Sequence, residues 1–378
     1  MGPLAGLKIV EFAGIGPGPF AGMLLADLGA EIIRIDRKQA SGLGLQRPRQ
    51  FDYALRSRKT IRIDLKSAAG TELALKLVDQ ADGLLEGFRP QVMERLGLGP
   101  DTCLARNPKL VYGRITGWGQ TGPLAPSVGH DLNYIAITGA LNAMGRAGGP
   151  PAIPLNLLGD YAGGSLYLII GMLSALLEAG RSGRGQVVDA AIVDGVASLS
   201  TQLYGMMRAG LLNLERGTNF IDSGAHFYDV YECADGKWVS IAPVEEKFYR
   251  QLLKALDIEL AAPQLERAGW PAAKVKIAQR IRAKTRDEWS ALLEGTEVCF
   301  APVLDFEEAT EHPHLKARGV YVDVAGEVQP APAPRFSRTQ PATPTAGEQA
   351  DTPDAVRAAL QGWLPEQDVG AALEAGIL

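Results

Sequence analysis

The sequence predicts an α/β protein with a large domain on a parallel sheet and a smaller α+β domain. Three observations lead to this prediction. The chain has 378 residues, more than one ordinary hydrophobic core holds. Its N-terminal half alternates short apolar runs with helical segments, which is typical of a parallel sheet. From about residue 220 the pattern instead becomes that of antiparallel strands.

The N-terminal segment has the order strand, turn, helix and strand, which forms one βαβ unit. Its parts are "LKIVEF" (7–12), "AGIGPGP" (13–19), "FAGMLLADLGA" (20–30) and "EIIRID" (31–36). Two further alternations follow: a helix at 70–83, a strand at 84–87, a helical turn at 92–97 and a strand at 109–116. The N-terminal half therefore builds a parallel sheet.

The turn "GIGPGPFAG" imitates the glycine fingerprint of dinucleotide-binding proteins, with Asp36 at the end of the next strand. Pro17 and Pro19 remove backbone N–H groups that a pyrophosphate would need. We therefore interpret the glycines as close strand-to-helix packing and expect neither a nicotinamide nor a flavin cofactor.

A long apolar helix follows from Asp160. Its core, "SLYLIIGMLSALLEAG" (165–180), is shorter than the roughly 20 residues of a membrane span. It is also bounded by Asp160 and Arg181. We expect a buried helix and no membrane span. The next segment, "GQVVDAA" (185–191), is predicted as a strand that runs into another helix.

The second half of the chain predicts a small α+β domain at 226–320. In "HFYDVYECADGKWVSIAPV" two alternating segments flank Asp235-Gly236, a strong hairpin signal. Helices are expected at 245–256 and at 272–294. The predicted organisation is a large domain at 1–200 completed by 330–378, a linker helix and connector at 201–225, and the small domain; residues 328–347 are expected to form an extended connector.

Composition excludes several classes of function. The net charge is −5 and the isoelectric point about 5.6, and no stretch concentrates Lys and Arg, so nucleic acid is not an expected partner. Cys103, Cys233 and Cys299 lie far apart without a C-x-x-C pair, which argues against disulfides and a thiolate zinc site. The N-terminus lacks a signal-peptide pattern, and "EAGIL" is no peroxisomal address, so we expect a cytoplasmic protein.

Basic residues gather at the predicted strand ends: Arg37, the run from Arg56 to Lys66, and Arg89. Ligands of open α/β sheets bind at the carboxyl ends of strands, where Arg can hold phosphates. Ordinary solvated surface charges explain the same residues equally well. Two other residues also fit more than one interpretation. His130 fits a plain loop-to-helix junction, and Asp160 fits either a helix N-cap or a functional carboxylate among the nearby glycines.

Several long motifs resemble the class III CoA-transferase (CaiB/BaiF) superfamily, and within it most closely the alpha-methylacyl-CoA racemases. The motifs are "LKIVEFAGIGPGPFAGMLLADLGAEIIRID", "EGFRPQVMERLGLG", "GRITGWGQTGP", "GHDLNY", "GRGQVVDAAIVDG" and "YECADGKWVSI", in the order and rough spacing of that family. The resemblance implies a Rossmann-like large domain made from both ends of the chain and a small middle domain. It also implies a homodimer of interlocked subunits, in which the large domain of one meets the small domain of the other at the active site.

The resemblance also implies functional residues. Catalytic His130, Asp160 and Glu245 match the family motifs, with Glu246 as a one-residue alternative to the glutamate that partners the histidine. The implied positions for binding the CoA ester are Arg37, Ile63, Asp64, Leu65, Lys66, Gly87, Phe88, Arg89, Arg95, Gly129, Asp131, Leu132, Asn133 and Tyr134. The expected substrate is an acyl-CoA, and no metal or separate cofactor is expected, because the thioester itself acidifies the α-proton.

The implied reaction is inversion of the α-carbon of a 2-methylacyl-CoA. One group removes a proton from one face and a second delivers a proton to the other, through an enolate. Two alternatives stay open. A class III CoA-transferase would use Asp160 as a nucleophile on the acyl-CoA. A non-catalytic acyl-CoA-binding protein would keep the fold alone, but this alternative predicts damage to the catalytic set, and none is visible.

Overall fold

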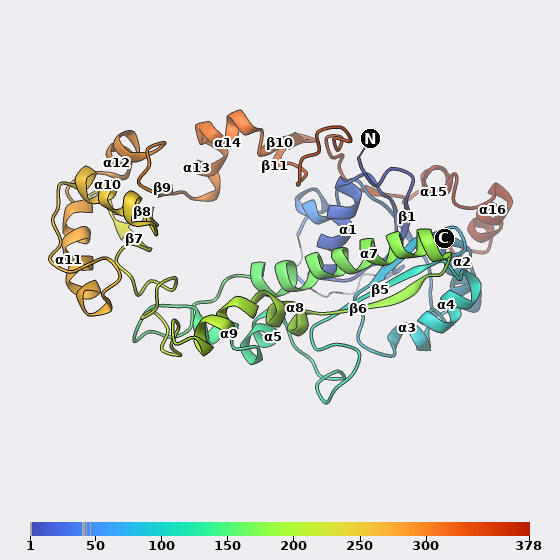
Figure 1. Cartoon of the computed structure of the whole chain (residues 1–378). Coiled ribbons are helices and arrows are strands. Elements are labelled where there is room, and N and C mark those ends of the chain that lie inside the picture. Colours follow the sequence, from blue (N-terminus) through green and yellow to red (C-terminus); the bar gives the residue numbers. More distant parts are fainter. Residues whose placement is uncertain (1, 40–41, 43, 46) are drawn as a thin grey trace. The chain divides into compact units, whose positions relative to one another are not determined.

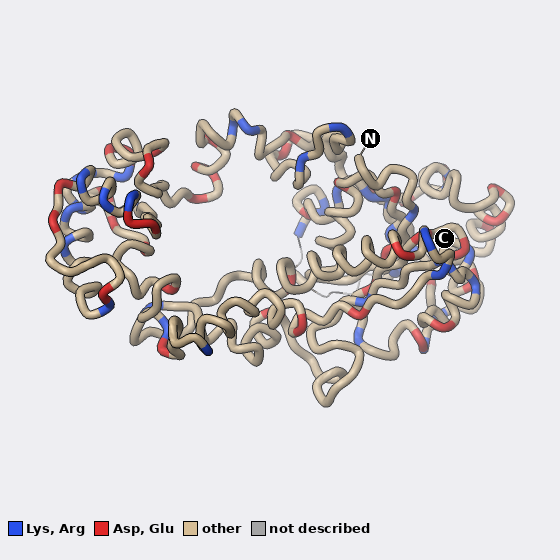
Figure 2. Tube along the Cα trace, in the orientation of Figure 1, with Lys and Arg blue, Asp and Glu red and all other residues tan. Residues whose placement is uncertain are grey.

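The computed structural model describes residues 2–39, 42, 44–45 and 47–378. The chain divides into two compact units (Figure 1). The first comprises Met1–Thr138, Leu155–Leu199 and Gly319–Leu378. The second comprises Gly139–Pro154 and Ser200–Arg318. Figure 2 shows acidic and basic residues interspersed within each unit.

The described residues of the first unit form a seven-stranded sheet in the order β12-β3-β2-β1-β4-β5-β6, and every neighbouring pair is parallel. The predicted parallel sheet is confirmed. The strands are β1 (Lys8–Phe12), β2 (Glu31–Asp36), β3 (Lys59–Arg62), β4 (Gly83–Glu86), β5 (Val111–Thr116), β6 (Gln186–Ala191) and β12 (Glu348–Gln349). The order from β3 to β6 is that of doubly wound nucleotide-binding folds, in which ligands bind where the strand order reverses, here between β1 and β4.

Helices cover both faces of this sheet, because successive strand side chains point to opposite sides. Ile9 and Leu85 pack with α1 (Pro17–Asp27) and α7 (Leu166–Ser182) in one core. Val10 and Leu84 belong to the core on the other face. The helices that contribute to this core include α2 (Ala68–Val78), α4 (Pro100–Arg106), α15 (Pro353–Leu360) and α16 (Glu366–Glu374). The two cores fix the sheet and the loops that follow its strands.

A π-helical segment, η3 (Leu157–Ser165), runs directly into α7 and carries Asp160. Together they form a helix of 26 residues, within which a window of 18 residues has a mean hydropathy of 1.5; by length and composition alone this helix could cross a membrane. It is nevertheless a core helix, since it packs on β5 and β6 and buries Leu168 and Met172 completely. The helix begins at Leu157, three residues before the predicted start at Asp160.

Several short elements complete the first unit. α3 (Val92–Arg95) and α8 (Ile192–Leu199) confirm the predicted helical turn at 92–97 and the predicted helix after the strand at 185–191, and α5 (Asp131–Ile137) follows His130. The 3-10 turns η1 (Arg49–Phe51) and η2 (Tyr53–Leu55) were not predicted. β10 (Tyr321–Val324) pairs antiparallel with β11 (Glu327–Pro330). The expected connector at 328–347 is therefore wrong at its beginning, where residues 328–330 belong to a hairpin strand.

The second unit contains the antiparallel sheet β7-β8-β9, which confirms the predicted hairpin. Gly236 adopts a φ of 74° in the turn between β7 (Asp229–Glu232) and β8 (Trp238–Ile241), a conformation that favours glycine. The predicted helix at 272–294 is in fact two, because Thr285 and Glu288 form a capping box that starts a new helix. The other elements are α6 (Ala140–Ala143), α9 (Thr201–Arg208), α10 (Glu246–Leu256), η4 (Arg267–Gly269), α11 (Trp270–Ile281), α12 (Arg286–Leu293), β9 (Phe300–Val303), α13 (Phe306–Glu311) and α14 (Pro313–Arg318).

Candidate functional site

The Asp160 carboxylate lies next to Gly16, in the loop that connects the carboxyl end of β1 to α1. Gly16, the residue that precedes α1, has a φ of 66°, and a Cβ built there would lie only 3.1 Å from Asp160 Oδ2. The glycine therefore leaves space for the Asp160 carboxylate and also allows the positive φ of the turn. This place is next to the reversal of strand order, where open α/β sheets bind their ligands. The sequence indicated a glycine-rich turn here, but not that Gly16 is part of the site.

The surroundings of Asp160 favour its protonated form. Burial and the nearby Asp131 carboxylate raise the pKa of Asp160 to about 6, while a hydrogen bond with Asn156 and the nearby His130 oppose the rise. The backbone is held by Ser165, whose hydroxyl lies 2.8 Å from Pro17 O and 3.0 Å from Asp160 O. A carboxyl group with a pKa near neutrality can both accept and donate a proton under ordinary conditions.

His130 immediately precedes α5 and is exposed to solvent. Its backbone N–H donates to Asn133 Oδ1 at 3.0 Å, which fixes the start of the helix. His130 lies close enough to Asp160 to influence the pKa of that carboxyl group. The fold thus brings two residues that are 30 positions apart in the sequence into one site of the first unit.

An aromatic pair supports the loop before His130. The ring centroids of Trp118 and Tyr134 are 4.7 Å apart in an edge-on arrangement, and the Tyr134 hydroxyl donates to Gly129 O. A Cβ at Gly129 would clash with both rings, at 2.8 Å from Tyr134 and 3.0 Å from Trp118. Burial and the charge of Asp160 raise the pKa of Tyr134, while Arg89 opposes the rise. The charges of Asp160 and of Arg89, in the loop that follows β4, therefore both act on Tyr134.

The predicted CoA-binding residues Arg37 and Arg89 lie after β2 and β4, where both are exposed. The Arg37 guanidinium carbon is 5.9 Å from the centre of the Phe88 ring, so the loops after the two strands meet. Among the residues that the structure describes, neither arginine forms an ion pair. Two cations without carboxylate partners are available to anionic ligand groups at this edge of the sheet.

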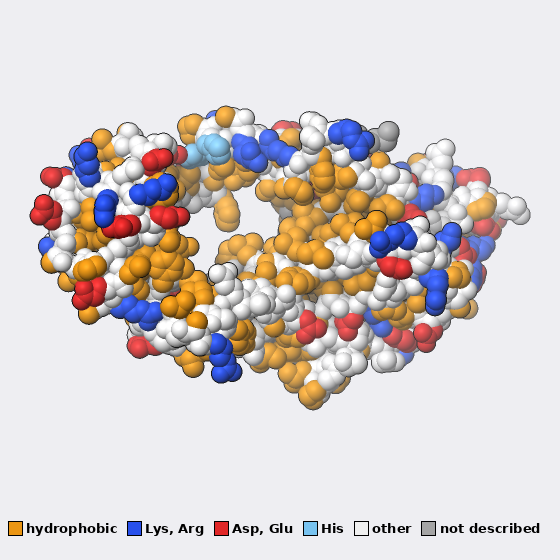
Figure 3. All heavy atoms as spheres, viewed as in Figure 1, with side chains coloured by type: hydrophobic (Ala, Val, Ile, Leu, Met, Phe, Trp, Pro, Cys, Tyr) orange, Lys and Arg blue, Asp and Glu red, His pale blue; other side chains and the backbone are white. Residues whose placement is uncertain are grey.

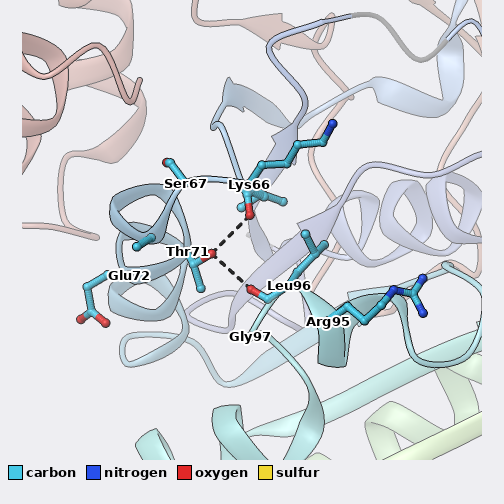
Figure 4. Close-up of a pocket in the computed structure, with 9 residues that line it drawn as sticks. Lys66, Ser67, Thr71, Glu72, Arg95, Leu96 and Gly97 are labelled. Atoms are coloured by element: carbon cyan, nitrogen blue, oxygen red, sulfur yellow. Dashed lines mark hydrogen bonds between the residues drawn. The ribbon is translucent and has the colours of Figure 1, made fainter.

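A surface groove of about 590 Å³ lies beside these loops (Figure 4). Three of the predicted binding residues, Leu65, Lys66 and Arg95, line it; its other residues are Ser67, Ala68, Thr71, Glu72, Leu96 and Gly97. The Thr71 hydroxyl lies 3.3 Å from Leu65 O and 3.2 Å from Leu96 O, and so joins the two walls. The cationic ends of Lys66 and Arg95 extend to one side of the groove, and Glu72 lies at the other. Ile63 and Asp64 precede it, and Ile63 is buried.

Glu86 holds the loop at Gly87–Arg89 in place and was not predicted from the sequence. Its side chain is fully buried, accepts the Phe88 N–H at Oε2 (2.7 Å) and binds Arg114 Nε through Oε1 (2.7 Å). Burial raises the pKa of Glu86 to about 7 in spite of Arg114. No sequence signal marks this role, because Glu86 occurs inside a strand.

The remaining predicted residues lie elsewhere. Glu245 immediately precedes α10 and Glu246 is its first residue; both are exposed and belong to the second unit. Leu132 and Asn133 are exposed on α5, whereas Asp131 is buried. All three cysteines are free. In the described part of the chain, no group of three or more His, Cys, Asp or Glu side chains is arranged to hold a metal ion.

Comparison with known proteins places this architecture in one family. The model of CoA-transferase family III matches residues 4–355. The alpha-methylacyl-CoA racemase of Mus musculus is 43% identical over 346 residues, which cover 91% of this chain and 88% of the mouse protein. The racemase of the same name from Homo sapiens is 40% identical over 347 residues, covering 90% and 88%.

A solved structure shows the same fold. The crystal structure of a CAIB/BAIF family protein from Brucella suis superposes with a TM-score of 0.80 at 27% sequence identity, covering 96% of this chain and 99% of that chain. The family match extends over almost the whole chain, and the two relatives exceed 30% identity over most of their length. This chain therefore belongs to CoA-transferase family III.

Proposed function

We propose that this protein is an acyl-CoA racemase that inverts the α-carbon of 2-methylacyl-CoA thioesters. The observation that carries the proposal is that His130 lies close enough to act electrostatically on Asp160, whose pKa is raised to about 6 by burial and by Asp131. A histidine beside a carboxyl group of raised pKa suits two-base proton transfer, because either side chain can remove or deliver a proton. The relatives named alpha-methylacyl-CoA racemase support the same reaction.

The proposed mechanism uses each residue as base for one enantiomer and as acid for the other. One residue takes the α-proton, and the electron pair of the broken C–H bond forms the enolate of the thioester. The other residue then delivers a proton to the opposite face of the α-carbon. The carbon skeleton and the thioester bond are unchanged, and the two residues end with their protonation states exchanged.

The CoA part of the substrate is proposed to lie along the edge formed by the loops after β2, β3 and β4. Arg37, Arg89 and Lys66 offer cations there, and the groove between Lys66 and Arg95 has space for a ligand group. Phosphate oxygens accept bidentate hydrogen bonds from Arg, which suits this arrangement. The acyl thioester then reaches toward Asp160.

The active form is proposed to be a homodimer in which Glu245 of one subunit partners His130 of the other. The first unit carries exposed apolar side chains along α7, including Leu166, Ile170 and Leu177. Figure 3 shows apolar side chains at the surface of the molecule. Such a stripe on a soluble protein marks an association surface. Mixing His130→Ala with Glu245→Ala should restore part of the activity, because some mixed dimers contain one intact site. Proven mixed dimers without activity would contradict shared sites.

The experiment that tests the reaction incubates each enantiomer of a 2-methylacyl-CoA in deuterated water. Wild-type protein should incorporate deuterium at the α-carbon and invert it. His130→Ala and Asp160→Ala should each lose inversion by about 10²–10⁴-fold, while each retains some exchange with a different enantiomer. His314→Ala serves as the control, because His314 is an exposed histidine of the second unit outside the proposed site.

A CoA-transferase is the second candidate, favoured by the family name and by the accessible carboxyl group of Asp160. In that reaction Asp160 attacks the acyl-CoA carbonyl, and a mixed anhydride replaces the thioester while CoA leaves as thiolate. Asp160 would then be indispensable and His130 dispensable. Wild-type protein that moves CoA between acids but incorporates no deuterium would exclude the racemase.

A further inference from the structure

Asp131 connects the two residues proposed to transfer protons. It directly follows His130 as the first residue of α5, but the residue is only 8% exposed. Its Oδ2 atom accepts the backbone N–H of Asp160 at 2.6 Å, and the N–H of Gly159 also bonds to this carboxylate. The start of α5 is thereby tied to the first turn of η3, which carries Asp160.

The fit around Asp131 is tight. A Cβ at Gly159 would lie 2.3 Å from Asp131 Oδ2 and 3.0 Å from a side-chain carbon of Ile135, so only glycine leaves room for the carboxylate. The second oxygen, Oδ1, is buried without a hydrogen-bond partner. A buried carboxylate with an unsatisfied oxygen is costly, and stability alone would favour a neutral side chain here.

Few charged groups surround Asp131 and Asp160. The ionisable groups that influence the pKa of Asp160 are Asp131 and His130, and Asp160, Asp131 and Arg89 influence the pKa of the nearby Tyr134. No salt bridge joins Asp131 or Asp160 to a cation in the part of the chain that the structure describes. Two carboxyl groups that share one site without a cation cannot easily ionise together.

Resting on the racemase function proposed above, we propose that Asp131 is a positioning residue that fixes Asp160 beside His130 and whose negative charge opposes the ionisation of Asp160. A helix cap without this role would contribute to stability alone. The electrostatic role has a different consequence: removal of the charge makes Asp160 more acidic. Asp160 then holds a proton less often at neutral pH, so its delivery of a proton to the enolate is impaired.

The test replaces Asp131 with Asn, which keeps the shape and one acceptor oxygen but removes the charge. Where Asp160 removes the α-proton, the reaction needs its ionised form, so the rising limb of kcat/KM should move to lower pH by about one unit. Where Asp160 donates the proton, the rate at neutral pH should fall by up to about tenfold, because the protonated form is depleted. Asp189→Asn is the matched control, since Asp189 Oδ2 also accepts a backbone N–H, from Gln120 at 3.2 Å, and burial also raises its pKa.

A second measurement does not depend on turnover. The carboxyl carbon of Asp160, in protein labelled with ¹³C-aspartate and identified by its loss in Asp160→Asn, should titrate at lower pH in Asp131→Asn than in the wild type. An unchanged titration in folded Asp131→Asn overturns the proposal. If Asp131→Asn does not fold, Asp131→Ser takes its place, and failure of both to fold assigns Asp131 a structural role only and also overturns it. Absence of deuterium exchange in the wild type would contradict the racemase alone, because the titration still decides the role of Asp131.

Discussion

Charged residues inside the sheet differ sharply from those at its carboxyl edge. Within the sheet, each buried carboxylate has an arginine: Glu11 binds Arg58, and Glu86 binds Arg114 at 2.7 Å. At the edge, Asp131 and Asp160 bind backbone and amide groups, and Arg37 and Arg89 face solvent. Pairing inside the sheet neutralises charge for the fold. Charges without a counter-ion at the edge stay available for a ligand or a proton, and this difference marks the site.

The first prediction breaks the pairing inside the sheet. Arg58→Met leaves the fully buried Glu11 carboxylate without its main partner, which should lower the free energy of unfolding by about 3–5 kcal/mol. Urea unfolding followed by circular dichroism measures the loss. The double variant Arg58→Met with Glu11→Gln should recover part of it, because no uncompensated charge remains. A double variant less stable than Arg58→Met would contradict this explanation.

The second prediction removes a cation from the edge. Arg37→Ala and Arg89→Ala should raise KM for the CoA ester by roughly 10-fold to 100-fold with little change in kcat, because phosphate contacts stabilise ground and transition states alike. Unfolding should be almost unaffected, in contrast to Arg58→Met. Arg95→Ala extends the test to the groove. Normal KM with a lowered kcat in both strand-end variants would show that the CoA phosphates bind elsewhere.

The third prediction concerns stability against pH at Asp160. Its pKa in the fold is raised from 3.8 to about 6, so the wild type loses stability as pH rises between these values and Asp160 ionises. The Asn side chain in Asp160→Asn cannot ionise. Above pH 7 the free energy of unfolding of this variant should therefore exceed that of the wild type by on the order of 1 kcal/mol, after allowance for partial exposure, and its unfolding temperature should be higher. This gain in stability over the wild type should vanish near pH 4. A gain of the same size at every pH would indicate that the variant improves packing and does not act through the charge of Asp160.

The fourth prediction concerns an ion pair at the surface, for comparison with the buried pair of Arg58 and Glu11. Arg106 pairs with Glu72 at 3.0 Å and with Asp79 at 2.5 Å, but all three side chains are partly exposed. Arg106→Ala should therefore change the free energy of unfolding by less than about 1 kcal/mol, and by less still at high salt. A loss as large as that of Arg58→Met would show that burial does not separate the two kinds of ion pair.

Most of the large unit could be predicted because its strands are strongly apolar. β2 (Glu31–Asp36) matches the predicted bounds, and β4 and β5 lie within two residues of theirs. β3 was missed because Lys59 and Arg62 make its sequence look like a basic surface run, while Thr60 and Ile61 are buried. The two-residue edge strand β12 depends wholly on pairing with β3. Its local sequence carries no signal.

Candidate site residues could be named from the sequence, but their arrangement could not. His130 and Asp160 could be named from motifs, whereas the contact of Asp131 with the Asp160 N–H exists only once α5 and η3 are packed together. Nothing in the local sequence shows which way the Asp131 side chain points. Similarly, the sequence predicts only close strand-to-helix packing for the glycines of this turn, and only the fold shows that the missing Cβ of Gly16 admits the Asp160 carboxylate.

The π-helical turn η3 lets one continuous helix present side chains to both the site and the sheet. Asp160 faces the site and Leu168, eight residues later, faces the sheet. Each residue of an α-helix turns the chain by about 100°, so a wide turn between these two residues changes their angular phase without moving α7. Deletion of one residue between Tyr161 and Ser165 would thus act as a rotation, turning Asp160 away from His130 while Leu168 keeps its place on the sheet.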